Sequence, residues 1–393
     1  VNLSNEISDK LTVATNISYF SNTFSGPAEG LAREAATWDA PLFPTYNPQG
    51  QYYANFGGVN ITGDRNAIAH VKDAGRINKT REQLKLSFLA TYKINDNLNV
   101  TGSYSYNKQN TEYQQYQVAV PLYSWDGDFS NNINNTSFIE EGTGPENSDG
   151  NITYKNYKAT LNYNNTFGDH NVSGLLAVEA EKNVINEFRA RRQGATGFID
   201  YGVYDLNLGA TDQILQTEGG GSSWGFFGYI GRINYDYKGK YLLELQGRRD
   251  GSSRFAQGQK WSNYGSISGG WVLTAEDFLA DNDVISFLKL RGGYGEVGST
   301  AGIGNFGYLS TVAFGTTVFG QTSAEQQATT RASSLFSSTT TWERIVNKEI
   351  GVDFRLFNSK VFGSVDLFNK RNIGMLIRRQ RPSLLGTNPP FTN

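Results

Sequence analysis

The sequence of 393 residues contains no cysteine and only two histidines. The absence of cysteine excludes a disulfide scaffold and thiolate metal sites. The formal net charge of −2 provides no basic surface for nucleic acid. No run of about 18 apolar residues occurs, so we expect no helical membrane span. A membrane protein built from strands is still possible, because barrel strands are short and alternate in polarity.

Aromatic residues are abundant: the chain has 24 Phe, 22 Tyr and 6 Trp. The mean hydropathy is nevertheless low, at −0.47. Aromatic girdles at two membrane interfaces, combined with a polar lumen, would give this combination. The length suits one large barrel or two ordinary domains.

The clearest strand pattern lies between Gly228 and Leu279. Apolar and polar residues alternate there with a period of two, which places each set on one face of a strand. The apolar set is Tyr229, Ile233, Tyr235, Tyr241, Leu243 and Leu245, and the polar set is Arg232, Asn234, Asp236, Glu244, Gln246 and Arg248. A packed core would not accept the polar set unpaired. Lipid outside and water inside explain both faces. In a soluble all-β domain, Tyr229, Tyr241, Leu243 and Leu245 would instead be buried against protein.

About twelve such strands follow one another along residues 1–393, joined by alternately short and long connections. We expect short turns near Lys10, Asp96, Asp169, Gly239, Asp281 and Asn358, and long loops at about 21–82, 109–152, 186–223 and 298–341. We also expect a hinge at Gly219–Gly221. The alternation of short and long connections is typical of outer-membrane barrels, whose short turns are periplasmic and whose long loops are extracellular. The predicted fold class is therefore all-β, a partial antiparallel transmembrane β-barrel domain over 1–393.

Three blocks of sequence are also familiar. They are GRINYDYKGKYLLELQGRRDGSSRF at 231–255 with Trp261 and SISGGW, LKLRGGYGEVGS at 288–299, and WERIVNKEIGVDFRLFNSKVFGSVDLFNKRN at 342–372. In this order they resemble the C-terminal barrel of the SusC/RagA-type TonB-dependent transporters. Tyr264-Gly265 stand where the family usually has Phe-Pro, Ser299 follows Gly298 where it tends to have Asn, and Gly374 replaces an acidic residue.

This resemblance implies a barrel of about 22 strands around a plugged lumen. We therefore expect a fragment that lacks the plug, since the chain opens on VNLSNEIS without Met and ends on NPPFTN. The implied function is TonB-dependent import of a glycan or peptide across the bacterial outer membrane. The implied partners are a SusD-like surface lipoprotein and the TonB complex, which acts through the N-terminal plug. No catalysis, cofactor or metal is predicted.

Three alternatives remain open. A TonB-dependent receptor for an iron chelate or corrinoid would share the barrel without the lipoprotein. A structural or adhesive barrel would transport nothing. An outer-membrane enzyme would need a catalytic constellation, which the sequence does not offer.

Candidate site residues fall into two groups. Arg248, Arg249, Asp250 and Arg254 could contact cargo from the lumen wall, but we favour paired structural charges, a common solution for a polar wall. Aromatic residues of the long loops and strand ends could stack on sugars or pack within the loops: Trp38, Tyr52, Tyr53, Trp125 and Trp224.

Four further patterns carry weaker predictions. G-x-G-x-x-G at Gly293–Gly298 and Gly302–Gly307 is not followed by a helix, so we expect a strand end and a loop. G-x-S-x-G at Gly221–Gly225 lacks a helix and a histidine partner. Asp126 and Asp128 could bind calcium, although the spacing fits no EF-hand. We expect Glu140, Glu141, Glu146 and Asp149 to form a solvated acidic loop rather than a glycosidase pair.

Overall fold

The computed structural model describes most of the chain: residues 1–27, 44–54, 66–133, 137–143, 150–194, 205–208, 210, 216–279, 282–309, 312–318, 326–332, 336–378, 380, 382 and 391–393. Most of these residues form one antiparallel sheet of 13 strands. Its strands are β1 (Asn2–Ser8), β2 (Leu11–Pro27), β3 (Gly75–Asn95), β4 (Leu98–Gln117), β7 (Phe138–Gly142), β8 (Asn151–Phe167), β9 (His170–Gln193), β10 (Gln216–Tyr237), β11 (Tyr241–Ser252), β12 (Trp261–Val272), β13 (Ile285–Ser299), β16 (Glu343–Leu356) and β17 (Val361–Ile373).

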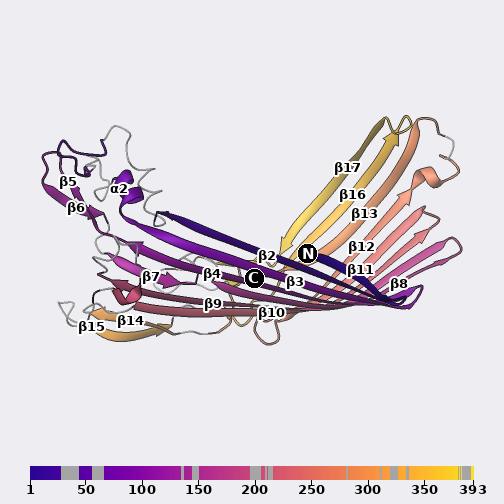
Figure 1. The fold of residues 1–393 in the computed structure, drawn as a ribbon. Coiled ribbons are helices and arrows are strands. Elements are labelled where there is room, and N and C mark those ends of the chain that lie inside the picture. The colour runs from indigo at the N-terminus through magenta and orange to yellow at the C-terminus, as the bar shows by residue number, and fades with distance from the viewer. Residues whose placement is uncertain are drawn as a thin grey trace.

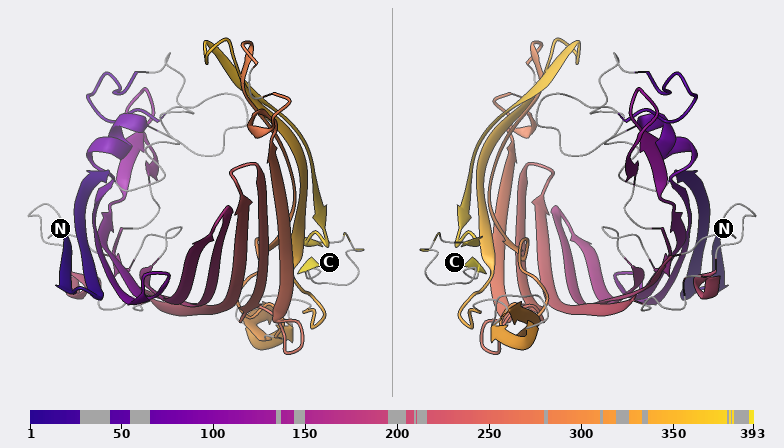
Figure 2. Two further views of the ribbon diagram at one scale, coloured as in Figure 1. Left: turned by 90° about the vertical axis from the view of Figure 1, so that its right-hand side faces the viewer. Right: turned by 90° about the vertical axis from the view of Figure 1, so that its left-hand side faces the viewer.

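The strands lie in the sheet in the order in which they occur in the chain, except that β7 and β8 share one position. The sheet curves into an open trough with β1 and β17 at its two edges (Figures 1 and 2). The predicted fold class, an all-β antiparallel barrel with about twelve strands, is confirmed.

Strands β7 and β8 occupy one position between β4 and β9. β8 pairs with the first half of β4, and β7 pairs with its last residues, Tyr113–Gln117. Both run antiparallel to β9 as well. They are therefore one strand interrupted by the segment between Gly142 and Asn151.

The remaining elements are short: β5 (Val120–Tyr123), β6 (Phe129–Ile133), α2 (Ala67–Lys72), β14 (Val312–Val318), β15 (Gln326–Ala332), β18 (Ile377–Arg378), β19 (Phe391–Thr392) and the 3-10 turns η2 (Leu206–Leu208) and η3 (Leu273–Ala275). Among the described residues, no helix is long and apolar enough to cross a membrane.

The two faces of the sheet differ in polarity and in exposure. Along β11, Tyr241, Leu243 and Leu245 are exposed, while Glu244, Gln246 and Arg248 are only partly exposed. Tyr229, Tyr241, Leu243 and Leu245 are 50, 45, 39 and 42% exposed. Side chains crowd on the inner side of a curved sheet, so the polar set lies on the concave face and the apolar set on the convex face. A soluble domain would show the reverse burial, and the barrel interpretation predicted this one.

Strands run further into the predicted loops than the sequence indicated. β2 continues to Pro27, β3 begins at Gly75, and β9 and β10 leave only residues 194–215 between them. The predicted hinge at Gly219–Gly221 is wrong, because these residues pair with Phe188, Glu187 and Asn186 inside the sheet. Ladder hydrogen bonds satisfy the backbone there without an apolar side-chain pattern.

The short turns lie where the sequence placed them, at one end of the sheet, which we call the short-turn end. Gly168, Lys238, Gly239 and Asn358 have positive φ in these turns. Asp281 lies outside the described residues. The opposite, long-connection end carries α2, β5 and β6 (Figure 1).

Candidate functional site: the concave wall and the loop module

A charged network lies on the concave face near the long-connection end. Arg248 Nε donates to both carboxylate oxygens of Asp250, at 2.6 and 2.7 Å, and Arg248 Nη2 lies 3.7 Å from Glu179 Oε2. Register explains the grouping, because Gly228 pairs with Asp250 on one side and Glu179 on the other. A Cβ at Gly228 would lie 2.8 Å from Asp250 Oδ1, so the glycine leaves room for the carboxylate. The guanidinium is thereby held between two acids.

Arg254 belongs to a second, adjacent network in the turn after β11. Its Nε donates to Asn305 Oδ1 at 3.1 Å, and its guanidinium lies 5.1 Å from the centre of the Trp224 ring. Asn305 Nδ2 in turn donates to Ser222 Oγ of β10. Burial lowers the pKa of Arg254. These contacts tie the turn, β10 and the segment after β13 together.

An aromatic cluster, which we call the Trp342 cluster, packs beside these networks. It consists of Phe226, Phe255, Tyr264 and Trp342, of which the last three are 1, 6 and 8% exposed. The Trp342 ring lies 5.2 Å from Phe255 and 6.1 Å from Tyr264, and its Nε1 donates to the Lys260 carbonyl at 2.9 Å. Each residue comes from a different strand or turn, so the cluster joins four segments.

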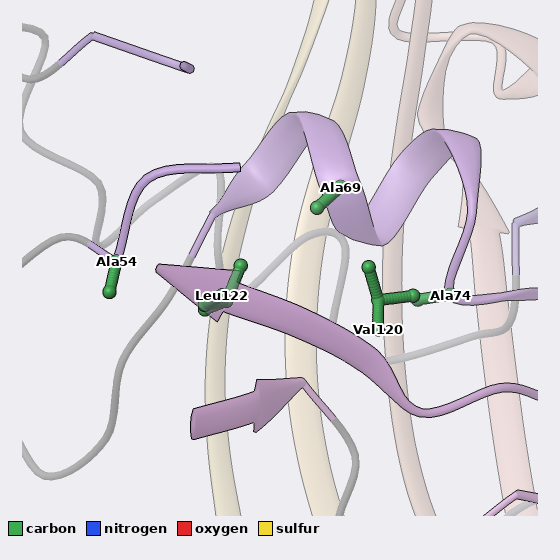
Figure 3. Close-up of a cluster of buried hydrophobic side chains, with 5 residues drawn as sticks. All are labelled: Ala54, Ala69, Ala74, Val120 and Leu122. Carbon is green, nitrogen blue, oxygen red and sulfur yellow. The ribbon is translucent and has the colours of Figure 1, made fainter. Parts of the chain in front are cut away.

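A loop module forms at the long-connection end from residues 45–54, 66–74 and 118–130. Its core consists of small and aliphatic side chains: Ala54, Ala69, Ala74, Val120 and Leu122. Figure 3 shows Ala69 of α2 above the strand that carries Val120 and Leu122. Asn66 caps α2 through Oδ1, which accepts from the Ala69 amide at 3.0 Å. Its Nδ2 donates to the carbonyls of Thr45 and Tyr53, which holds the module's segments together.

The structure gathers three of the five predicted aromatic site residues in this module. Tyr52 stacks on Tyr46 with ring centres 5.2 Å apart, and Tyr53 meets Trp125 edge to face at 5.5 Å. The Tyr52 hydroxyl donates to Asp73 Oδ2; burial, followed by this carboxylate, raises the pKa of Tyr52. Trp125 is 49% exposed.

The other two predicted aromatic residues are elsewhere. Trp224 lies on β10 within the Arg254 network, where its ring also lies 6.4 Å from Tyr154. Trp38 lies outside the described residues. The four candidates that the structure describes therefore divide between two places, which the sequence did not indicate.

The sequence missed several residues of the wall. Glu179 and Asn305 carried no pattern that predicts their contacts, because both meet their partners only through strand register or loop folding. Arg291 was also missed: it lies 3.2 Å from Asp353 and 2.6 Å from Asp366 in a further concave network. Trp342 and Phe255 belonged to the familiar blocks, which was the only signal for the cluster.

The predicted solvated acidic loop is wrong for Glu140 and Glu141. Glu140 is 7% exposed in β7, where it accepts from the Tyr113 hydroxyl at 2.6 Å and lies 4.0 Å from Arg191. Glu141 accepts from Gln114 Nε2 at 2.7 Å. Strand pairing with β4 and β9 brings these partners together. Glu146 and Asp149 lie outside the described residues.

The other motif matches lie in ordinary positions. Gly221–Gly225 is part of β10, and Gly293–Gly298 is part of β13. Asp126 and Asp128 lie in a turn in which Ser124 Oγ accepts from the Asp128 amide. Within the described part of the chain, no three His, Asp or Glu side chains are grouped as metal ligands would be.

Comparisons with known proteins give the class. No family model matches the chain. A TonB-dependent receptor of Formosa agariphila is 27% identical over 398 residues, covering 100% of this chain and 38% of the receptor. The TonB-dependent receptor SusC of Bacteroides thetaiotaomicron is 31% identical over 160 residues, covering 41% of this chain and 16% of SusC.

Among solved structures, the RagAB peptide importer in the closed-closed state matches with a TM-score of 0.80 and 16% identity, covering 100% of this chain and 42% of the other. Its open-open state gives 0.77 and 17%, covering 100% and 41%. The fold is therefore that of a TonB-dependent transporter barrel. Within this class, the chain is a homologue of TonB-dependent receptors that include SusC, and the resemblance to the SusC/RagA type is confirmed. It spans about 38% of the length of the Formosa receptor.

Proposed function

We propose that residues 1–393 form part of the barrel domain of an importer that draws a large nutrient across the bacterial outer membrane with energy from the TonB complex. The observation that carries this proposal is sequence similarity to a TonB-dependent receptor along the whole chain, over 398 aligned residues. The TonB complex would act through an N-terminal plug inside the barrel.

The physical character of the sheet supports a membrane wall around water. Exposed apolar side chains suit contact with lipid, and the paired charges of Arg248 and Arg291 suit a polar lumen. In this arrangement the short turns are periplasmic and the long-connection end faces outside. The wall networks have structural roles, since their charges are paired with one another.

The finer proposal is a glycan or peptide cargo and a SusD-like surface lipoprotein as partner. The three familiar sequence blocks, the similarity to SusC and the fold shared with a peptide importer support it. Cargo would be enclosed between this lipoprotein and the plug. Tyr53 and Trp125 of the loop module, together with Trp38, would contact cargo or partner, and Trp224 would contact cargo lower in the lumen.

Affinity purification tests the proposal. The full-length parent protein, tagged and gently extracted from outer membranes, is identified with its companions by mass spectrometry, and a tagged porin from the same membranes is the control. We expect a stoichiometric surface lipoprotein with the parent and none with the porin. A barrel without a lipoprotein, or one that carries an iron chelate or corrinoid, would contradict the paired-importer proposal and favour a metal-chelate receptor.

A further inference from the structure

The convex face of the sheet carries an apolar groove that crosses β2 to β13. It consists of three adjoining depressions of about 820, 700 and 560 Å³. Leu161 and Leu176 line both the first and the second, and Ala159 and Val178 line both the second and the third. The three depressions therefore form one continuous surface groove.

A row of three glycines leaves part of the groove floor without side chains. Gly231, Gly247 and Gly265 pair with one another across β10, β11 and β12. Leu176 continues this row on β9, Ile267 lies two residues beyond Gly265 on β12, and both help to line the first depression. A Cβ built on Gly247 would meet no atom within 4 Å, so the space above it is open.

Cations border the groove at the side toward the long-connection end. Lys155 of β8 pairs directly with Lys182 of β9. On the same face of the sheet, the two lysines lie two residues further along their strands than the cross-strand row of Tyr157 and Phe227. Tyr157 and Phe227 line the third depression. Like charges directly opposite on a sheet repel each other, so this pair lacks internal compensation.

Two further cations share this face. Lys108 lies on β4, and Arg249 lies on β11 with its guanidinium 5.4 Å from the centre of the Trp261 ring. Among the described residues, no carboxylate forms an ion pair with Lys108, Lys155, Lys182 or Arg249. The cations are thus available to an external anion.

Two lysines at the short-turn end have acidic partners. Lys238 lies 3.0 Å from Asp169, and Lys240 lies 3.2 Å from Glu276. The four cations beside the groove lie at its border nearest the proposed cell exterior, and none of them forms an ion pair with a described carboxylate.

We propose that this groove binds a phosphorylated, multiply acylated glycolipid of the outer leaflet. One acyl chain lies in the groove over Gly247, and a headgroup phosphate lies between Lys155 and Lys182. Lysine binds phosphate as a point charge, and clusters of basic side chains at a membrane surface attract anionic lipid headgroups. Apolar groove and unneutralised cations together require a ligand with both chemistries, which a free anion or a neutral lipid lacks. The site rests on the proposed outer-membrane location but not on cargo or on the lipoprotein partner.

Native mass spectrometry of the full-length parent tests the site. The protein in mild detergent is titrated with bis-phosphorylated lipid A, with zwitterionic phosphatidylethanolamine and with inorganic phosphate. We expect selective retention of lipid A, weakened roughly tenfold or more in the K155Q/K182Q double variant. Gly247→Leu should also weaken retention by filling the groove, while inorganic phosphate should not displace the lipid.

Matched variants complete the test. Lys238→Gln removes a cation at the short-turn end, and Gly269→Leu adds a side chain to another convex-face glycine outside the first and second depressions; both should retain lipid A as the parent does. Equal retention by K155Q/K182Q and the parent would overturn the headgroup site, and equal retention by Gly247→Leu would overturn the groove. The copurifying lipoprotein is recorded in the same samples, so a missing partner and a missing lipid site give separate readings.

Discussion

The two ends of the sheet are held together by different interactions. At the long-connection end, buried clusters join segments that are distant in sequence: the Trp342 cluster and the core of the loop module. At the short-turn end, aromatic side chains stay exposed, and several of them have a polar partner close by. Tyr241 and Trp271 donate to Glu276 Oε1 at 2.7 and 3.1 Å, and His170 Nδ1 lies 2.7 Å from the Tyr235 hydroxyl.

This difference follows from connection length. Most turns at the short-turn end have two to four residues and position their strands mainly through backbone hydrogen bonds, so their side chains need few contacts. A long connection loses conformational entropy when it becomes ordered, and burial of apolar surface offsets this loss. We therefore expect substitutions at the long-connection end to cost more than matched substitutions at the short-turn end.

The largest effect is expected for Trp342→Ala. Trp342 is 8% exposed and contacts three other rings, so truncation should lower the free energy of unfolding by about 3–5 kcal/mol. Urea unfolding of the full-length parent in lipid vesicles measures it. The control is Trp261→Ala, since Trp261 is 44% exposed on the convex face. An equal loss in both variants would mean that burial does not distinguish the two sites.

Gly298→Ala tests the same end through backbone proximity. A Cβ at Gly298 would overlap the Tyr264 ring, which cannot move because Trp342 and Phe255 pack around it. We expect a loss of about 1–3 kcal/mol in the same unfolding measurement. Gly247→Ala is the control, with no atom within 4 Å of its new Cβ. If both alanines are tolerated equally, the ring is not confined as the structure indicates.

The short-turn end was largely predictable from the sequence, and the long-connection end was not. Turns such as Gly168-Asp169 and Lys238-Gly239 interrupt a two-residue alternation, and both signals are local. The alternation also identified the two faces of the sheet. In contrast, Gly219–Gly221 resembled a loop because it lacks apolar alternation, yet backbone pairing with β9 makes it strand.

The candidate site depended even more on contacts that are distant in sequence. Tyr53 reaches Tyr123 and Trp125 across about 70 residues, and only the folded module shows that they meet. Glu179 reaches Arg248 through strand register. Register can be deduced only when the pairing strands are known. The alternation within each strand therefore identified charged residues of the site but not all of their partners.

Asn66→Ala is expected to loosen the loop module with a smaller cost. It removes the cap of α2 and the hydrogen bonds to Thr45 and Tyr53, for a loss of about 0.5–2 kcal/mol. Hydrogen exchange in residues 66–74 and 118–123 should become faster while β10 to β13 stay protected. Asn97→Ala, in a short turn, is the control and should leave both regions unchanged. Protection retained in the module would show that Asn66 does not hold it.

The smallest effect is expected at Glu276, and it depends on pH. The Tyr241 hydroxyl, followed by the Trp271 indole, favours the carboxylate and lowers the pKa of Glu276 below its ordinary value of 4.5. A lowered pKa in the folded state gives stability that is fully present above 4.5 and is lost as the pH falls through the folded value. Hydrogen exchange around η3 should therefore accelerate on acidification below pH 4.5 beyond the intrinsic change. Glu276→Gln should show faster exchange already at neutral pH and no such acid step, whereas the neighbouring Asp277→Asn should keep it. An acid step that persists in Glu276→Gln would assign the pH dependence to another group.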